Sequence, residues 1–199
     1  ISFWTKVNLD ILTVIVFSYL LGSVPFGLLL TKIFLKKDLR KFGSGNIGAT
    51  NVLRTGNKIL AFLTLSLDLL KGYLTVFFSM HYYPELIYLS GLICFVGHIF
   101  PIWLKFKGGK GVATYLGIIL ALSFKLALIF GLSWIFILLI TRYSSLSSII
   151  SSMNVFLFSL YSYSVNPDFV YFTFFIIIVF THRENLLRLK NKTEHKIKF

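Results

Sequence analysis

The sequence has very few cysteines and acidic residues, and both shortages exclude classes of protein. Its one cysteine, Cys94, lies in an apolar run, so there is no disulfide framework and no thiolate metal site. Only seven of its 199 residues are Asp or Glu, and they are scattered along the chain. Magnesium needs clustered carboxylates, so phosphatidyl-alcohol transferases and most metal-dependent phosphatases are disfavoured. We expect no metal and no cofactor.

Apolar residues are in excess instead. They make up 56% of the chain, and runs close to twenty residues recur. A soluble domain of this length must keep its surface wet and does not carry so many. Such runs are typical of membrane-spanning helices. We therefore predict an all-α integral membrane protein, with residues 1–199 as a single domain. The first apolar segment is too long for a cleavable signal peptide and lacks a cleavage site, so we expect none.

Seven transmembrane helices are expected, at about residues 11–31, 59–80, 86–104, 112–123, 127–140, 153–165 and 169–180. Small residues and Pro25 within the first favour close packing or a kink. Asp68 and Lys71 lie three apart in the second, where we favour a mutually satisfied ion pair over a functional cavity. His98 shows no partner and is interpreted as structural. Residues 142–152 are a serine-rich connection, and 166–168 a turn.

Positive charge is concentrated on one side of the membrane in this topology. The connections that follow the first, third and fifth expected helices, together with the C-terminal tail, lie on that side and hold 17 of the 20 Lys and Arg residues. The positive-inside rule then predicts the N-terminus outside and the C-terminus in the cytoplasm. Topology thus explains the net charge of +13, and we expect no nucleic acid partner. Four polar segments (43–54, 105–114, 142–152 and 181–194) share the cytoplasmic side, which favours one composite site.

The first polar segment, residues 43–54, reads GSGNIGATNVLR. Its glycines let the backbone approach a ligand, and successive N–H groups can cup an anion. A helix beginning near Ile47 would add partial positive charge, and Arg54 has the planar fork of donors that grips a phosphate. The alternative is a glycine-rich surface turn capped by Ser and Asn.

The second segment, FKGGKGVAT at residues 106–114, is not a nucleotide-binding P-loop. It lacks the Ser or Thr directly after the Lys and a preceding strand. Two interpretations stay open. The segment either starts a helix with Lys110 at the lipid headgroups, or forms a second phosphate cradle with Lys110 as a point charge.

The last of the four polar segments contains a third motif, residues 181–189, which reads THRENLLRL. His182 and Asn185 are three apart and would share a helix face, so both could bind one phosphate or carbonyl oxygen. Alternatively His182 is merely solvated, and Arg183 and Arg188 anchor lipid headgroups. The loops offer no evident general base and no His-x-x-x-Asp pair, the signature of many soluble-type glycerolipid acyltransferases. The residues indicate binding of several negative charges beside a bilayer.

With these motifs in order, nearly the whole chain resembles the bacterial acyl-phosphate:glycerol-3-phosphate acyltransferases, the PlsY family. The likeness also includes residues 19–27 and 68–72. The resemblance implies transfer of a fatty acyl group from acyl phosphate to the 1-hydroxyl of glycerol 3-phosphate. Lysophosphatidic acid and phosphate are the products of this first committed step of phospholipid synthesis. Family knowledge points to substrate-assisted catalysis without an acyl-enzyme. One departure is Lys192, where the family usually has glycine.

By similarity, the site lies at the cytoplasmic face of a bacterial cell membrane, among membrane lipids. The resemblance implies the catalytic residues Ser44, Arg54, Lys110, His182 and Asn185. It implies the substrate-binding residues Gly43, Gly45, Asn46, Gly48, Thr50, Asn51, Gly108, Gly109, Gly111, Ser148 and Arg183. Ser145 or Ser147 could take the place of Ser148. The rival function, a transporter or binding protein for a phosphorylated solute, should show polar residues across the membrane midplane and inverted repeats. We find no repeat.

Overall fold

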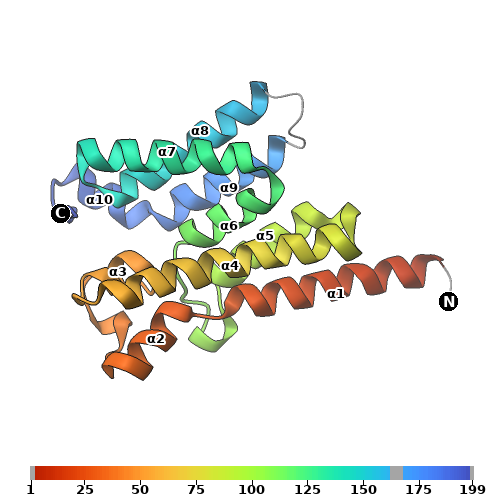
Figure 1. The fold of residues 1–199 in the computed structure, drawn as a ribbon, viewed down its shortest axis with the longest axis horizontal. Helices are drawn as coiled ribbons and strands as arrows, with labels where there is room; N and C mark the ends of the chain where they lie inside the picture. Colours follow the sequence, from red (N-terminus) through yellow and green to blue (C-terminus); the bar gives the residue numbers. More distant parts are fainter. Residues whose placement is uncertain (1–2, 162–167, 198–199) are drawn as a thin grey trace. The chain divides into compact units, whose positions relative to one another are not determined.

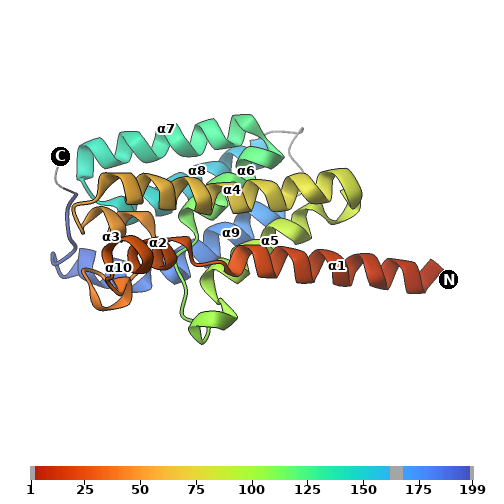
Figure 2. The same ribbon diagram turned by 60° about the horizontal axis from the view of Figure 1, so that its bottom comes forward.

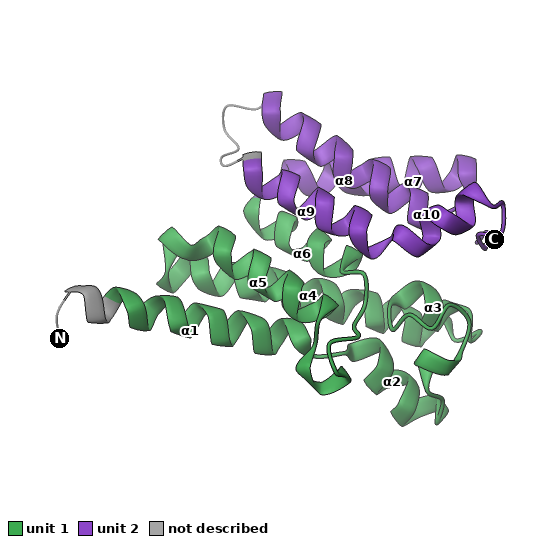
Figure 3. Cartoon of the chain, turned by 180° about the vertical axis from the view of Figure 1, so that it is seen from behind, with its two compact units in different colours: residues 1–122 green, residues 123–199 purple. Residues whose placement is uncertain are grey.

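The structure is a computed structural model that describes residues 3–161 and 168–197 (Figure 1). These residues form helices and no strand. Two compact units divide the chain, Ile1–Leu122 and Ser123–Phe199 (Figure 3). The all-α prediction is confirmed for the described residues, and a single acyltransferase domain over the whole chain stays a prediction.

Unit 1 is built on two pairs of packed helices, α1 with α5 and α4 with α6. Glycines allow the close approach, because a Cβ on Gly22 would overlap the backbone of Cys94 and one on Gly72 would overlap Thr114. The small residues of the first span thus pack as expected. The α-helices described in this unit are α1 (Phe3–Ser23), α2 (Phe26–Leu35), α3 (Ala49–Leu53), α4 (Lys58–Tyr82), α5 (Ile87–Ile99) and α6 (Val112–Leu122).

A break at Pro25 separates α1 from α2. Proline has no N–H to donate and its ring obstructs the preceding turn, so α1 stops at Ser23 and α2 begins at Phe26. Figure 2 shows α2 following directly on the end of α1, and together the two helices give an apolar span over Val7–Leu35. The expected interruption of the first span is therefore present.

Unit 2 contains the described helices α7 (Phe124–Thr141), α8 (Ser144–Tyr161), α9 (Asp168–Thr181) and α10 (Arg183–Lys190), with α8 packed on both α7 and α9. The expectation that 142–152 is a connection is wrong from Ser144 onward, because these serines begin α8. Three of them, Ser147, Ser148 and Ser152, donate their hydroxyls to carbonyls one turn back, those of Tyr143, Ser144 and Ile149. Such back-bonding lets serine enter an apolar helix without an unsatisfied donor.

Five of the described helical segments are long and apolar enough to cross a membrane. A sixth is possible if α9 and α10, which meet at a bend of 58°, form one span. The apolar α6 has only 11 residues. These segments follow the expected order, while the count of seven and the orientation of the termini stay predictions. The expected end of the sixth span at Val165 lies outside the described residues, as do positions 166 and 167 of the expected turn.

Candidate active site

The first glycine-rich segment is a folded loop fixed to the end of unit 1. Ile47 and Val52 are buried in an apolar cluster whose other buried members are Leu28, Leu39, Leu60 and Ala61. The left-handed backbone of Gly43 and Gly45, with φ of +56° and +71°, turns the chain between these anchors. The expected helix begins at Ala49 rather than near Ile47 and is only five residues long.

Asn51 holds this loop together from inside. It is buried, and its Nδ2 donates to the carbonyls of Leu39, Phe42 and Asn46 at 3.2, 2.9 and 2.8 Å. Its Oδ1 accepts the N–H of Ser44 at 3.1 Å. The Asn46 side chain likewise accepts the N–H of Gly48. Both asparagines were predicted to bind substrate, and the structure shows them shaping the loop backbone.

The side chains expected to meet a phosphate lie on the outer surface of the same loop. Ser44 and Arg54 are exposed, and Thr50 is half-buried. The backbone N–H of Ser44 donates to Asn51 Oδ1, and this hydrogen bond fixes the position from which the Ser44 hydroxyl projects. A rigid backbone bearing accessible donors can receive an anion without reorganising.

The second glycine-rich segment is fixed to the end of α5. Gly108 N–H donates to the Ile99 carbonyl at 2.9 Å, and Gly109 N–H to the His98 carbonyl at 3.1 Å. A Cβ on Gly109 would overlap the His98 ring. These two N–H groups therefore face the protein and hold the loop. Lys110, half-buried, follows directly, and α6 begins at Val112 as expected of a loop-to-helix start.

The third motif lies where α9 bends into α10. His182 is buried at the bend, with its Nδ1 at 2.8 Å from the Ile178 carbonyl. A carbonyl only accepts, so Nδ1 carries the proton, and in the neutral ring Nε2 is an acceptor. In its neutral form His182 can therefore accept a hydrogen bond from a hydroxyl through Nε2, and the predicted hydrogen bond from His182 to a phosphate stays a prediction. Arg183 is exposed and turns back, with its Nη1 donating to the Phe180 carbonyl.

Glu194 organises the residues around Asn185, and the sequence analysis did not single it out. Its Oε1 accepts from Asn185 Nδ2 at 2.6 Å and from Ser145 Oγ at 2.9 Å, and its Oε2 accepts from Arg188 Nε at 2.7 Å. Burial raises the pKa of Glu194, but the hydrogen bonds from Asn185, Arg188 and Ser145 outweigh it, so the pKa lies below its ordinary value. Asn185 is thereby held with its amide nitrogen toward Glu194.

The three candidate serines of α8 are placed differently. Ser148 is buried, and its Oγ accepts from Trp134 Nε1 at 3.0 Å. Ser147 donates to its own helix, whereas Ser145 contacts the carboxylate that holds Asn185. Ser145 is therefore linked to the third motif through Glu194, and contact of Ser148 with substrate stays a prediction.

Lys192 adopts the left-handed conformation, with φ of +57°, which explains the glycine usual at this position. We expect Lys192→Gly to stabilise the protein by about 1 kcal/mol, because a non-glycine residue pays roughly that amount there. The side chain is exposed, so little packing is lost. Thermal unfolding in detergent measures the effect. Lys192→Ala is the matched control, since alanine keeps the Cβ, and an equal gain in both variants would contradict this explanation.

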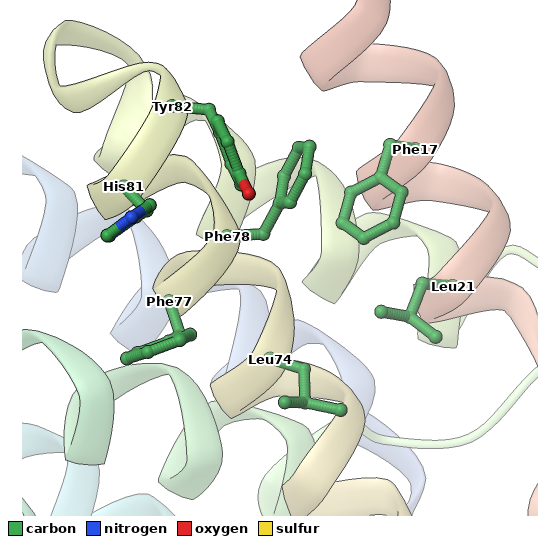
Figure 4. Close-up of a pocket in the computed structure, with 7 residues that line it drawn as sticks. All are labelled: Phe17, Leu21, Leu74, Phe77, Phe78, His81 and Tyr82. Atoms are coloured by element: carbon green, nitrogen blue, oxygen red, sulfur yellow. The ribbon is translucent and has the colours of Figure 1, made fainter.

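An apolar pocket of about 460 Å³ lies elsewhere in unit 1, between α1 and the C-terminal part of α4 (Figure 4). It is lined by Phe17, Leu21, Leu74, Phe77, Phe78, His81 and Tyr82. None of these residues belongs to the three motifs. Within residues 3–161 and 168–197, no group of three His, Cys, Asp or Glu side chains could hold a metal ion.

Known proteins match this chain over nearly its full length. A sequence model of the family described as glycerol-3-phosphate acyltransferase matches residues 12–192. Proteins of that name from Pelagibacter ubique and Brucella anthropi are 53% and 49% identical to it. Each match covers 96% of this chain, with 99% of the Pelagibacter protein and 94% of the Brucella protein.

Solved structures agree. The glycerol 3-phosphate form of PlsY, an integral membrane glycerol 3-phosphate acyltransferase, is 40% identical with a TM-score of 0.89, over 94% of this chain and 96% of that one. The lysophosphatidic acid form of PlsY is 39% identical with a TM-score of 0.86, and the match covers 94% of this chain and 95% of that one.

The fold and the motifs therefore define an acyltransferase of a membrane-protein family with apolar helices. The chain belongs to the glycerol-3-phosphate acyltransferase family. Phospholipid synthesis follows from that membership, and the rival interpretation as a transporter is not supported.

Proposed function

We propose that this enzyme transfers a fatty acyl group from acyl phosphate to the 1-hydroxyl of glycerol 3-phosphate. The observation that carries the proposal is the likeness to PlsY in two forms, one with glycerol 3-phosphate and one with lysophosphatidic acid. These two ligands differ by the acyl group that such a reaction adds. Glycerol 3-phosphate is accordingly the acceptor that we assign to this chain.

The donor, acyl phosphate, is what the resemblance to the PlsY family implies, and the two glycine-rich loops of unit 1 support it. Each loop has a backbone held by hydrogen bonds and carries a cation that we assign to phosphate, Arg54 in the first loop and Lys110 in the second. Two phosphorylated substrates, acyl phosphate and glycerol 3-phosphate, match two such loops. The acyl tail stays among apolar helices, where each buried methylene contributes roughly 0.8 kcal/mol.

The reaction needs no protein base if the acceptor's own phosphate takes the hydroxyl proton. The 1-hydroxyl oxygen attacks the acyl carbonyl carbon, the bond from that carbon to the phosphate oxygen breaks, and inorganic phosphate leaves. A phosphate monoester with a second pKa of about 6 is mostly dianionic at neutral pH and accepts the proton. The protein orients both substrates and stabilises charge on the leaving phosphate.

We assign an individual role to each motif residue, and the contacts of the side chains support these assignments. Arg54 and Lys110 neutralise phosphate, and Ser44 donates a hydrogen bond as a positioned hydroxyl rather than acting as a nucleophile. His182 accepts from a glycerol hydroxyl through Nε2, since its Nδ1–H is occupied by Ile178. Asn185 binds the same substrate through the part of its amide turned away from Glu194. The excess of Lys and Arg on one side favours a cytoplasmic site.

Purified protein in lipid or detergent should release inorganic phosphate when it is given palmitoyl phosphate and glycerol 3-phosphate together. Release should require both substrates and yield 1-acylglycerol 3-phosphate in equal amount, because the reaction is stoichiometric. Palmitoyl coenzyme A in place of the acyl phosphate separates the two donor classes. Turnover with palmitoyl coenzyme A but not with palmitoyl phosphate would refute the assignment of acyl phosphate as the donor. A covalent acyl adduct on Ser44 or Ser148 would refute the mechanism.

A further inference from the structure

A buried ion pair lies on α4, away from the residues assigned to substrate. Lys71 Nζ is 2.8 Å from Asp68 Oδ1, and the two side chains are only 1% and 4% exposed. The ion pair expected from the sequence is therefore present. Removing two charges from water is costly, and apolar residues of similar volume often stabilise a fold as well or better. The pair therefore calls for a role besides stability.

Lys71 fixes the break between α1 and α2. Its Nζ donates to the Val24 carbonyl at 2.8 Å and lies 5.6 Å from the centre of the Phe26 ring. Val24 directly precedes Pro25, where the helical hydrogen bonding is interrupted. The ammonium group thus ties the end of α1 to the start of α2.

The start of α2 in turn supports the first glycine-rich loop. A Cβ on Gly27 would overlap the Ile47 carbonyl, so α2 lies directly against the loop backbone. Leu28, the next residue of α2, shares the buried cluster with Ile47 and Val52. A shift of α2 would therefore move the loop that carries Ser44 and Arg54.

Asp68 leads to the second loop through His98. His98 Nδ1 is 3.7 Å from Asp68 Oδ1 and 3.2 Å from Thr114 Oγ1, so the histidine expected to lack a partner has two polar neighbours. Its ring lies against Gly109, and its carbonyl accepts the Gly109 N–H. Movement of His98 would displace the loop immediately before Lys110.

We propose that the Asp68–Lys71 pair positions both glycine-rich loops relative to each other, through the α1–α2 break on one side and His98 on the other. Asp68 and Lys71 are positioning residues for the acyl transfer and touch neither substrate. This inference rests on the proposed function, in which the two loops hold the two phosphate groups whose geometry decides the rate.

The double variant Asp68→Asn/Lys71→Met tests the pair, because it removes both charges and leaves neither one buried alone. We expect its melting temperature to stay within about 3 °C of wild type. Its kcat at saturating substrates should fall about 100-fold, the loss typical of small displacements near a reacting centre. Lys71→Met alone should melt lower, because it leaves the carboxylate unpaired. If the double variant melts near wild type, above Lys71→Met, and its kcat is still low, the pair acts by positioning the loops and not by stabilising the fold.

Thr75→Val is the matched control. Thr75 is buried one turn further along α4, and its hydroxyl donates to the Lys71 carbonyl at 2.7 Å, so kcat should stay within about two-fold of wild type. If the double variant does not fold, Thr114→Val decides. It removes the hydroxyl beside His98 without burying a charge, and should lower kcat about 10-fold. The proposal would be overturned if the folded double variant kept the wild-type kcat, or if Thr114→Val did. An inactive wild-type protein would refute the proposed function instead.

Discussion

Arg54→Ala and Lys110→Ala are each expected to lower kcat/KM for phosphate release by about 100- to 1,000-fold. Each substitution removes a cation from a loop whose backbone is held by other residues, namely Asn51 in the first and the α5 carbonyls in the second. Arg54 is exposed and Lys110 half-buried. The loss should therefore appear in turnover while the variants still fold and keep melting temperatures near that of wild type.

Controls for this prediction come from the same connections. Lys41→Ala removes an exposed positive charge beside the first loop, and Lys107→Ala removes an exposed one within the second, so they test whether net charge alone matters. Both should retain turnover within about two-fold. Arg54→Lys keeps the charge but loses the planar fork, and should fall between wild type and Arg54→Ala. Full activity in both alanine variants would remove these residues from the site.

The sequence predicted the helices well because long apolar runs have few alternatives. Where polar residues continue such a run, the prediction was wrong, as at Ser144–Ser152. Ser148 and Ser152 satisfy their hydroxyls within α8, a local effect that composition does not reveal. The break at Pro25 was expected, since proline acts on its own backbone.

Contacts between residues far apart in the chain could not be predicted from the sequence. Ser145 and Glu194 are separated by 49 residues and meet through a single hydrogen bond. His98 and Thr114 are brought together only by the packing within unit 1. Glycine patterns located the loops, but the inward roles of Asn46 and Asn51 depend on which face of each loop is buried. The hydrogen bond from Arg188 to Glu194 likewise became evident only in the structure.

Glu194→Ala is expected to destabilise the protein by about 3 kcal/mol, because it leaves three donors around a buried position without their acceptor. Those donors come from Asn185, Ser145 and Arg188. Asn185 would also lose the contact that fixes its amide, so kcat should fall further than the folded fraction does. Glu194→Gln should lose less stability, since its carbonyl oxygen still accepts. Glu184→Gln is the matched control, because Glu184 is exposed and 4.0 Å from Arg188.

The charge on Glu194 gives a second, independent readout of the same contact. Its pKa is lowered in the folded protein, so its contribution to stability is present above the unfolded pKa of about 4.3 and is lost as pH falls through the folded value. Asp38, whose pKa the Arg40 side chain also lowers, contributes equally to wild type and variant. The difference in melting temperature between wild type and Glu194→Gln should therefore shrink below about pH 4. A difference that stays constant on acidification would show that the carboxylate is not held in its charged form by these hydrogen bonds.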